Sequence, residues 1–473
     1  MNLADYLLQQ STSQIVTDQH TYTHQEIVQR TNQAANAMQQ AGLLPEERVL
    51  LALPDGIDYV AALLGALKVG AAVVMVNPGL SPEEIQDLLE YSRATLAVYA
   101  HPLQSRFLKA TLTDLGHPSH HFESFPSHPD DIALWLFSGG TTGRPKAVLQ
   151  SHQSFINTTE LYAKKFLGYT QHDRTLSVPK LFFGYATGSN LFFPLSVGAT
   201  SILFPEKCTP DKLFEQVQKH RPTLLINVPT LVNQMVNHPQ AHCQDLSSLR
   251  ACTSAGEALP ESLYYKWKET FPTVELLDGL GTAEMWHIFL SNHPDDVKPG
   301  SLGKAVPGFD IKIADDDGQE LPRGEVGRLW VAGDSRALCY WQRSAESQQA
   351  LRGRYFAASD LMRQDQDGYF FYCGRADEML KVAGRWLAPQ EVESCLLTHP
   401  AVKECAVIGK VSPDGLTRPH AIVVKDGEVS AEQLQAHVLQ SLEPYKHPRS
   451  VTFVDHLPRT HLGKVDRGAL RKS

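Results

Sequence analysis

Residues 134–149, with the sequence LWLFSGGTTGRPKAVL, decide how the first part of the chain is interpreted. The run at 134–137 is apolar and predicts a short buried strand. The loop after it contains Gly139, Gly140 and Gly143, which let the backbone turn tightly and present its N–H groups to an anion. Val148 and Leu149 then resume a strand. We therefore expect a glycine-rich loop between two strands.

The polar side chains of this loop suit phosphate groups. Hydroxyls donate to phosphate oxygens and a lysine adds positive charge. The side chains concerned are Ser138, Thr141, Thr142 and Lys146. The pattern differs from the Walker loop, because Pro145 separates the last glycine from the lysine and a strand follows in place of a helix. We interpret the segment as a phosphate-binding loop, and the alternative is a plain glycine-rich turn.

Helices and strands are expected to alternate upstream of this loop. Residues 23–26 form a capping-box pattern ahead of an amphipathic helix, and residues 81–84 form a second one. Apolar runs at 49–53, 71–76 and 96–100 predict buried strands. Repeated strand–helix–strand units predict an α/β fold with a largely parallel sheet and helices on both of its faces.

The pattern changes after about residue 303. Short β-like segments at 309–313 and 328–332 alternate with Gly and Pro turns, which predicts an antiparallel or β-barrel-like subdomain. A smaller α/β pattern follows residue 374, with a helix at 389–397 and a capped helix that begins after Ser430. We expect a large N-terminal domain at 1–375 and a small C-terminal domain at 376–473.

Composition excludes several classes of protein. The 473 residues exceed what one hydrophobic core accommodates, and the net charge of -9 argues against a nucleic-acid-binding surface. No apolar run approaches the length of a membrane span, and residues 1–11 lack the features of a secretion signal. Seven scattered cysteines are expected to be reduced thiols in a cytoplasmic protein. The His-rich segment 117–128 is read as a surface loop, with a metal site as the alternative.

The loop at 138–147 resembles a signature of the adenylate-forming superfamily, which contains acyl-CoA synthetases, peptide-synthetase adenylation domains and luciferases. Five later segments resemble further signatures of that superfamily and come in its order. They are SAGEALP at 254–260, DGLGTAE at 278–284, YFAASD at 355–360, GRADEMLK at 374–381 and PRTHLGK at 458–464. A charged residue in any one of these segments, taken alone, would be interpreted as a solvated surface group. Six segments in the order of the superfamily are not explained in that way.

The resemblance implies a nucleotide site and assigns residues to it. Glu284 would help to hold Mg²⁺, Asp360 and Arg375 would contact the ribose, and Lys464 would be the lysine that promotes adenylation. Gly256, Glu257, Asp278 and Gly279 would border or cross the nucleotide. The family threonine that contacts the α-phosphate is replaced by Ala283, and Thr282 stands one position earlier. Either adenylation is weakened or Thr282 supplies the hydroxyl.

The resemblance also implies two half-reactions with ATP, Mg²⁺ and coenzyme A. A carboxylate attacks the α-phosphorus of ATP and releases pyrophosphate, and a thiol then attacks the acyl-adenylate and releases AMP. The small C-terminal domain would be mobile and rotate about a hinge at Asp377 between the two steps. Gly384 would then lie close to the pantetheine arm of the acceptor, where a glycine permits close approach.

Four segments narrow the resemblance to the benzoate–CoA ligase branch: PKLFFGY at 179–185, NLFFP at 190–194, EMWHIFLSN at 284–292 and LKVAGRW at 380–386. By that resemblance a flat aromatic pocket is lined by Phe183, Gly184, Tyr185, Ala255, Leu280, Gly281 and His287. Aromatic and small side chains suit such a slot. The alternative is that the phenylalanines and His287 belong to the hydrophobic core.

The leading hypothesis is an aryl-acid–CoA ligase that acts on a small aromatic carboxylic acid, as a monomer or homodimer, without nucleic-acid or membrane partners. A second hypothesis keeps the adenylation and loads the phosphopantetheine of a carrier protein. A third is a protein that binds nucleotide or aryl acid and has lost turnover, for which Ala283 is the support. Lys464, Glu284 and Asp360 oppose this third hypothesis.

Overall fold

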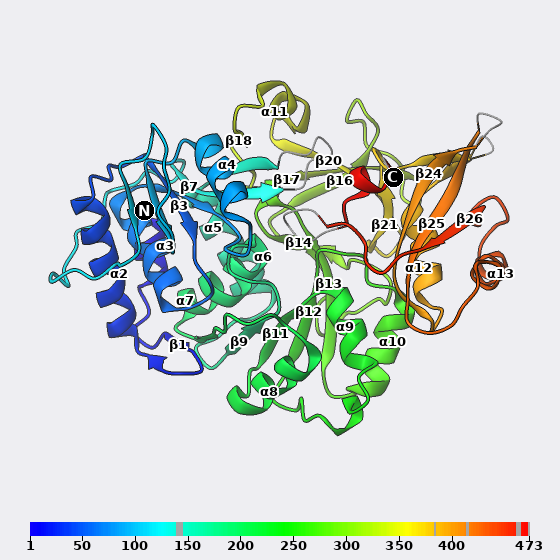
Figure 1. Cartoon of the computed structure of the whole chain (residues 1–473), viewed down its shortest axis with the longest axis horizontal. Coiled ribbons are helices and arrows are strands. Elements are labelled where there is room, and N and C mark those ends of the chain that lie inside the picture. The colour runs from blue at the N-terminus through cyan, green and yellow to red at the C-terminus, as the bar shows by residue number, and fades with distance from the viewer. Residues whose placement is uncertain (139–144, 383–384, 413–415, 460–464, 472–473) are drawn as a thin grey trace. The chain divides into compact units, whose positions relative to one another are not determined.

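The computed structural model describes residues 1–138, 145–382, 385–412, 416–459 and 465–471 (Figure 1). The chain divides into two compact units. The first consists of residues 1–138, 146–310 and 331–356, and the second contains residues 311–330 and the chain from 357 onward. The expected domain boundary between Arg375 and Ala376 stays a prediction. Within the described residues, no helix combines the length and the apolar character needed to cross a membrane.

One sheet of the first unit carries the glycine-rich loop. It has seven strands in the order β18-β8-β7-β4-β3-β5-β6, parallel at its centre and antiparallel where β7 meets β8 and β8 meets β18. Its strands are β3 (Arg48–Ala52), β4 (Ala72–Met75), β5 (Leu96–Tyr99), β6 (Ala110–Leu112), β7 (Ile132–Ser138), β8 (Lys146–Ser151) and β18 (Cys339–Tyr340). The expected strands before and after the loop are confirmed as β7 and β8.

A second sheet of this unit has nine strands in the order β15-β14-β13-β12-β11-β9-β10-β1-β2. The strands from β1 to β13 along this order pair in parallel, while β2, β14 and β15 are antiparallel at the two ends. Its strands are β1 (Gln14–Val16), β2 (Thr21–Tyr22), β9 (Arg174–Ser177), β10 (Thr200–Ile202), β11 (Leu224–Asn227), β12 (Ala251–Ser254), β13 (Glu275–Gly281), β14 (Ile288–Ser291) and β15 (Lys304–Ala305).

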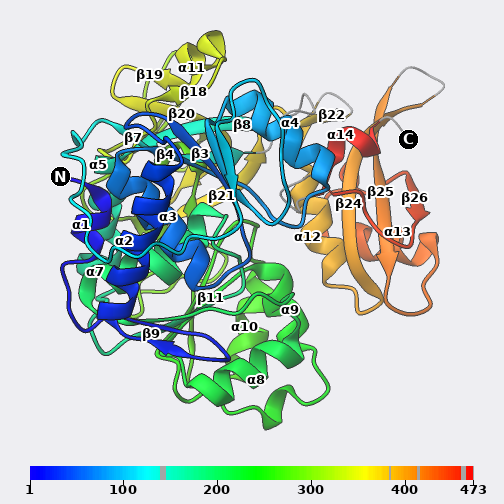
Figure 2. The same cartoon turned by 60° about the vertical axis from the view of Figure 1, so that its left-hand side comes forward.

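Helices cover both sheets (Figure 2). The predicted capping boxes are present, Thr23 with Glu26 at α2 and Ser81 with Glu84 at α4. Gly65 lets α3 pack tightly on α2, since a Cβ there would lie 2.9 Å from the Ala35 nitrogen. The helices of this unit are α1 (Leu3–Leu7), α2 (His24–Gln40), α3 (Ile57–Val69), α4 (Pro82–Ser92), α5 (His152–Thr158), η1 (Thr159–Phe166), α6 (Gly184–Thr187), η2 (Gly188–Phe192), α7 (Phe193–Val197), α8 (Pro210–His220), α9 (Pro229–Val236), η3 (Ala241–Cys243), α10 (Glu261–Thr270), η4 (Ala283–Met285) and α11 (Ser344–Ala350).

The second unit contains most of a five-stranded sheet in the order β16-β17-β20-β19, with β21 paired to β20. The expected sheet-rich region is therefore confirmed, and its barrel form stays a prediction. A two-stranded and a three-stranded sheet follow. The strands are β16 (Asp310–Ala314), β17 (Val326–Ala332), β19 (Leu351–Arg352), β20 (Tyr355–Gln364), β21 (Phe370–Arg375), β22 (Leu380–Val382), β23 (Arg385–Leu387), β24 (Val402–Val411), β25 (Thr417–Lys425) and β26 (Ser450–Phe453).

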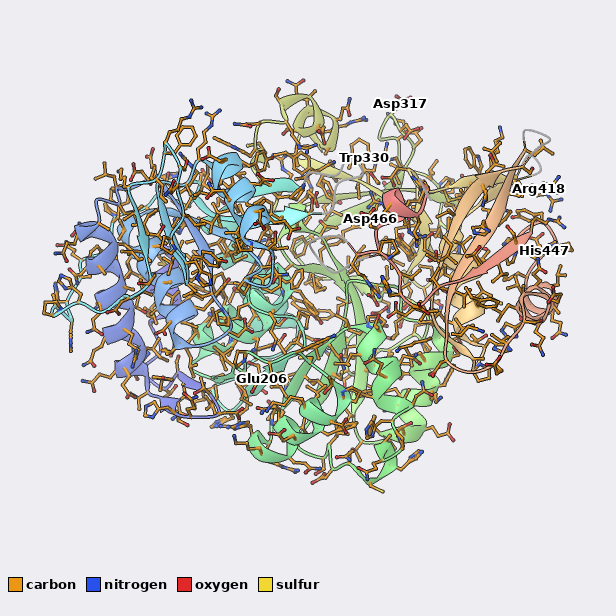
Figure 3. All side chains as sticks on the ribbon, viewed as in Figure 1. Glu206, Asp317, Trp330, Arg418, His447 and Asp466 are labelled. Carbon is orange, nitrogen blue, oxygen red and sulfur yellow. The ribbon has the colours of Figure 1, made fainter. Side chains whose placement is uncertain are left out.

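Three helices belong to this second unit, and the first two were predicted: α12 (Pro389–Leu397), α13 (Ala431–Ser441) and α14 (Arg467–Leu470). Ser430 and Gln433 form the expected capping box of α13. Asp466, labelled in Figure 3, caps α14 by accepting a hydrogen bond from the Ala469 N–H at 2.9 Å. The α/β character predicted for the C-terminal region is confirmed.

A buried carboxylate ties helix α3 to the segment that leads into α6. Asp55 lies just before α3, is 8% exposed, and accepts a hydrogen bond from the Leu181 N–H at 2.9 Å. The Leu181 carbonyl in turn accepts the Tyr59 hydroxyl at 3.0 Å. Burial raises the pKa of Asp55 to about 6, although Lys180 and the Leu181 N–H favour its charged form. The groups that face this carboxyl are therefore Lys180, Tyr59 and the thiol of Cys208.

This raised pKa predicts a pH-dependent stability. Because the pKa is higher in the folded than in the unfolded chain, the contribution of Asp55 to stability is greatest at low pH and is lost as the pH rises through about 6. We expect the unfolding free energy of Asp55→Asn, relative to wild type, to increase by about 1 kcal/mol between pH 5 and pH 7. Urea denaturation at both pH values measures it.

The matched control is Asp58→Asn, which removes an exposed carboxylate from the first turn of the same helix. The difference in unfolding free energy between Asp58→Asn and wild type is expected to be equal at pH 5 and pH 7. A difference for Asp55→Asn that stays constant or falls with pH would contradict the assignment.

Candidate active site

The predicted phosphate loop joins two paired strands. Ser138 ends β7 and Lys146 begins β8, and the two residues are direct partners in the antiparallel register. The Lys146 ammonium lies 3.0 Å from the Glu346 carboxylate of α11 and 5.2 Å from the centre of the Tyr340 ring. The other predicted loop residues, Gly139, Gly140, Thr141, Thr142 and Gly143, lie outside the described residues.

Glu284 lies in a short turn that three hydrogen bonds from other segments hold in place. Its carboxylate accepts a hydrogen bond from the Tyr340 hydroxyl at 2.8 Å, and its carbonyl accepts one from the Ala337 N–H at 2.7 Å. The carbonyl of Ala283 accepts the Gln150 side chain, also at 2.7 Å. Strands β8 and β18 thereby fix the position of a carboxylate that the sequence had singled out. Tyr340 and Gln150 were missed, because their partners are more than 50 residues away in sequence.

The backbone of this turn is unusual at Trp286, which has a φ of 62°. A bulky residue rarely adopts this left-handed conformation, and surrounding contacts must hold it. The indole ring packs edge-on against Phe155, with ring centres 4.4 Å apart, and also contacts Phe192 and Phe193. The turn thus directs Glu284 towards Tyr340 and His287 towards Tyr185. Sequence reasoning gave no signal for this conformation.

The donor chemistry at Glu284 fits a magnesium ion held mainly by substrate. Mg²⁺ prefers oxygen ligands and is commonly bound by one or two carboxylates together with phosphate oxygens. Within the described ranges there is no cluster of three or more His, Cys, Asp or Glu side chains suited to a metal. A single carboxylate held by hydrogen bonds matches a metal bound by one carboxylate together with phosphate oxygens. It does not match a site in which the protein supplies every ligand.

The ends of β12 and β13 bring the predicted nucleotide residue Asp278 beside the segment 254–260 that resembles an adenine border. Ser254 and Asp278 are partners in the parallel register, and such strand ends are the usual ligand position in α/β sheets. Asp278 is buried, one of its carboxyl oxygens has no hydrogen-bond partner, and burial raises its pKa well above the ordinary value. Burial thus favours the neutral form of this carboxyl, which is the form that can donate a hydrogen bond.

The neighbouring glycines and Glu257 have structural reasons for their identity. Gly256 has a φ of 93°, which favours glycine, and a Cβ at Gly279 would lie 2.7 Å from the Leu290 carbonyl. Glu257 accepts the Thr230 hydroxyl at 2.5 Å. Thr282, in contrast, has a buried hydroxyl for which no described residue is a hydrogen-bond partner. That hydroxyl is available to a ligand, beside the Ala283 that cannot offer one.

His287 is the centre of the predicted aryl pocket. It is 2% exposed, and its Nε2 lies 3.1 Å from both the Tyr185 carbonyl and the Ser189 hydroxyl. Burial lowers its pKa to about 3, so the ring is neutral. Because a carbonyl can only accept, Nε2 carries the proton and Nδ1 is a bare acceptor, and this Nδ1 is buried without a partner.

Two of the other predicted pocket residues, Tyr185 and Gly281, contact this histidine. The Tyr185 ring is 5.5 Å from the His287 ring, and its hydroxyl donates to Thr253 at 2.8 Å. A Cβ at Gly281 would lie 2.5 Å from the His287 carbonyl. Gly188, which sequence reasoning missed, is equally constrained, since a Cβ there would lie 2.4 Å from the His287 ring. The remaining predicted residues are Phe183 and Gly184, which precede Tyr185, buried Ala255, and Leu280.

Two phenylalanines of this region are core residues, in agreement with the alternative interpretation. Phe192 and Phe193 are fully buried and pack around Trp286. Phe182 and Phe183 are only partly buried, with ring centres 4.3 Å apart. The sequence could not separate the two pairs, because both are double phenylalanines after a short polar break.

The predicted ribose residues belong to the second unit. Asp360 on β20 and Arg375 on β21 are direct antiparallel partners, and their charged groups are 3.9 Å apart. Arg375 also donates two hydrogen bonds of 2.9 Å to Asp377, and these carboxylates raise its pKa. Gly384 and Lys464 lie outside the described residues. Arg467 of α14, three positions after Lys464, forms a two-pronged ion pair with Glu393 at 2.6 and 2.7 Å.

Comparison with known proteins gives a consistent result. A family model described as AMP-binding enzyme matches residues 8–341, and one described as AMP-binding enzyme C-terminal domain matches residues 391–464. The chain is 39% identical to a benzoate–CoA ligase of Thauera aromatica, over 97% of this chain and 92% of the relative.

Two solved structures extend this similarity to the fold. The structure of an anthranilate CoA ligase in complex with anthranoyl-AMP has a TM-score of 0.93 at 35% identity, covering 100% of this chain and 97% of the other. That of a benzoate CoA ligase from Burkholderia xenovorans LB400 has a TM-score of 0.89 at 36% identity, with both chains covered completely. The protein therefore belongs to the AMP-binding, adenylate-forming enzymes, in the branch of the benzoate–CoA ligases.

Proposed function

We propose that the protein activates a benzoate-like aromatic carboxylic acid with ATP and transfers the aryl group to the thiol of coenzyme A, releasing AMP and pyrophosphate. The observation that carries this proposal is the turn between β13 and β14. Within four residues it offers a fastened carboxylate, Glu284, and a buried neutral imidazole, His287. The first suits the magnesium of a nucleotide and the second the wall of an uncharged aromatic pocket.

In the first half-reaction an oxygen of the aryl carboxylate attacks the α-phosphorus, and the bond from that phosphorus to the bridging oxygen of pyrophosphate breaks. A magnesium ion held at Glu284 would neutralise charge on the phosphate oxygens. The chain's own residues bind the phosphates through the loop around Ser138 and Lys146, and Thr282 offers its unpartnered hydroxyl in place of the missing threonine. Lys464 supplies a further positive charge to the reacting oxygens.

In the second half-reaction the thiol sulfur attacks the acyl carbon and AMP leaves with both electrons of the carbon–oxygen bond. We assign Asp360 and Arg375 to the ribose, Gly256, Glu257, Asp278 and Gly279 to the base and its surroundings, and Gly384 to the pantetheine arm. Asp377 is assigned to the hinge of a mobile domain formed by residues 376–473. The ion pair between Asp377 and Arg375 supports this hinge role, because a rearrangement at Asp377 would change the ion pairing of both residues.

The pocket favours a flat apolar acid. His287 is neutral and surrounded by Tyr185, Tyr162 and Phe193, so a second charge on the substrate ring would be buried without a counter-ion. Its bare Nδ1 accepts a hydrogen bond, which supports a ring that carries a hydroxyl or amino donor as well as benzoate itself. The thiol of a carrier protein is the second candidate acceptor, since it presents the same pantetheine arm as coenzyme A.

Pyrophosphate release tests the function. The purified protein is incubated with Mg-ATP and a panel of benzoates, aminobenzoates, hydroxybenzoates and fatty acids, with and without coenzyme A. We expect turnover on one aryl acid that rises strongly with coenzyme A. Release that ignores coenzyme A would favour a carrier-protein acceptor, and absence of release with every acid would contradict the proposal.

Lys464→Ala tests the division into half-reactions. Loss of a preorganised charge on the reacting phosphates is expected to slow adenylate formation by about 100- to 1000-fold. Thioester formation from supplied aryl-adenylate is expected to stay within about 3-fold of wild type, because the bond to pyrophosphate is already broken. Rapid-quench assays of each step measure the two rates. Lys403→Ala, an exposed lysine of the same unit, is the control, and equal losses in both half-reactions would refute the role.

Tyr340→Phe tests the fastening of Glu284. Removal of the hydroxyl frees the carboxylate that would bind Mg²⁺, and outer-shell changes of this kind weaken metal binding by about 10-fold or more. We expect a weaker affinity for Mn²⁺, titrated by electron paramagnetic resonance in the presence of ATP, and a matching rise in the Mg²⁺ requirement of turnover. Tyr265→Phe, which alters an exposed tyrosine, is the control. Unchanged Mn²⁺ affinity would show that Tyr340 does not position the metal ligand.

A further inference from the structure

An arginine to which the described part of the chain offers no partner lies beside the Glu284 turn. Arg336 follows β17 in a tight turn, in which its N–H donates to the Gly333 carbonyl at 3.1 Å. Its side chain is partly buried, and among the described residues none forms a hydrogen bond or an ion pair with it. Burial lowers the pKa of its guanidinium, and no carboxylate offsets this effect. Partly buried charges without a partner are rare in folded proteins, because desolvation is costly.

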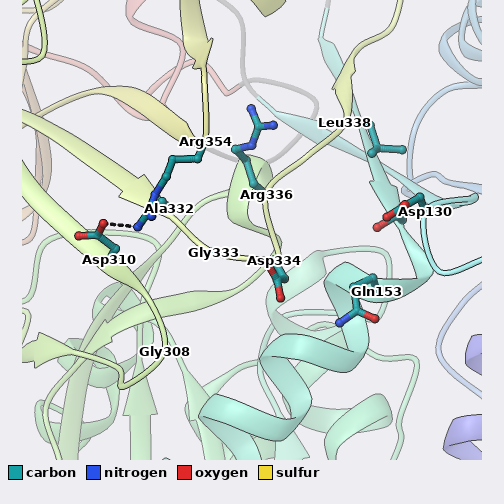
Figure 4. Close-up of a pocket in the computed structure, with 11 residues that line it drawn as sticks. Asp130, Gln153, Gly308, Asp310, Ala332, Gly333, Asp334, Arg336, Leu338 and Arg354 are labelled. Carbon is teal, nitrogen blue, oxygen red and sulfur yellow. Dashed lines mark hydrogen bonds and ion pairs between the residues drawn. The ribbon is translucent and has the colours of Figure 1, made fainter.

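The other cations of this neighbourhood are already paired. Arg354 lines the same cavity but forms an ion pair with Asp310, which also accepts the Tyr355 hydroxyl at 2.6 Å. Lys146 is 3.0 Å from Glu346. Figure 4 shows the two arginines diverging: the Arg354 side chain reaches Asp310, while that of Arg336 points away from Asp334. Of these three cations, Arg336 alone forms no ion pair with a side chain among the described residues.

The cavity that Arg336 lines is large enough for a small anionic group. Its volume is about 580 Å³, within the usual range for ligand pockets. Asp130, Gln153 and Asp334 also line it (Figure 4). With carboxylates on its other walls, the Arg336 end is the part of this cavity that attracts negative charge.

The position of Arg336 indicates which anion it meets. The next residue, Ala337, donates its N–H to the Glu284 carbonyl at 2.7 Å, and Tyr340 of the same segment donates to the Glu284 carboxylate at 2.8 Å. Consecutive Cα atoms are about 3.8 Å apart, so the base of the Arg336 side chain lies one residue step from Ala337, which contacts the turn assigned to Mg²⁺. Phosphates that share a metal with Glu284 are within reach of a side chain as long as arginine.

We propose that Arg336 binds the β- and γ-phosphates of ATP and the pyrophosphate that leaves, which rests on the proposed function. A guanidinium offers a planar fork of donors that matches two phosphate oxygens. When the bond from the α-phosphorus to the bridging oxygen breaks, negative charge grows on the pyrophosphate, and Arg336 stabilises that charge. It is therefore a further substrate-binding residue of the adenylation step, additional to those found from the sequence.

Two phosphate sources share this chemistry, the polyphosphate of ATP and the phosphates of coenzyme A. Proximity to Glu284 favours ATP. Isothermal titration calorimetry of ATP, pyrophosphate, AMP and coenzyme A, each added to the full-length enzyme without aryl acid, separates them. AMP is the internal reference, because it lacks the β- and γ-phosphates.

For Arg336→Ala we expect the affinities for ATP and pyrophosphate to fall by about 10- to 100-fold, as for loss of a charged hydrogen bond, while AMP and coenzyme A bind as in wild type. Arg336→Lys keeps the positive charge but not the planar set of donors, and we expect a smaller loss of affinity for ATP and pyrophosphate. Arg354→Ala, which removes a paired cation from the same cavity, is expected to leave all four affinities unchanged.

Three results would overturn the proposal: equal losses for ATP and AMP, a loss for coenzyme A alone, or no loss for any ligand. The first would indicate general damage to the site and the second a coenzyme A contact. These measurements need no turnover. If no aryl acid is activated, the proposed function fails while the contrast between ATP and AMP still tests Arg336.

Discussion

The hydrogen bonds that hold residues 282–287 are the constraint on which the larger unit depends. The turn must present Glu284 on one side and His287 on the other, and it does so with Trp286 in a left-handed conformation that a tryptophan rarely adopts. Gln150, Ala337 and Tyr340 fasten one side. The ring contacts of Trp286 with Phe155, Phe192 and Phe193 fasten the other. A strained backbone persists only where such contacts over-determine it.

The electrostatics of the site follow from burial. His287 and Asp278 both lie where water is excluded, and exclusion favours the neutral form of each. Burial therefore acts against charge at His287 and at the end of β13. Glu284, Lys146 and Arg336 are the charged side chains to which the proposed function assigns magnesium and phosphate. Under that proposal, recognition of an apolar ring is separate from recognition of phosphate.

The second unit uses ion pairs for a different purpose. Arg467 joins Glu393 of α12 and approaches Glu378 at 3.4 Å, while Arg375 joins Asp377 and Asp360. These contacts fix α14, the chain segment after Lys464, to the rest of its unit. Removing one partner of such a shielded pair costs more free energy than the intact pair contributes, because the remaining charge is left uncompensated.

Much of the fold was predictable, because its determinants are local. Thr23 with Glu26, Ser81 with Glu84 and Ser430 with Gln433 cap their helices through contacts three residues apart, and apolar runs marked the buried strands. The family and its branch were also readable, since the glycine-rich loop and the later segments are contiguous in sequence.

What only the tertiary structure decided are contacts between distant segments. The pairing of Tyr340 with Glu284, the tautomer of His287 set by the Tyr185 carbonyl, and the lack of a partner for Arg336 among the described residues each depend on residues far away in the chain. Nothing in a local pattern specifies such contacts, because the chain must first bring β8, β13 and β18 together. The sequence by itself therefore determined the class of chemistry, and the packing of these strands decided which side chains are free to take part in it.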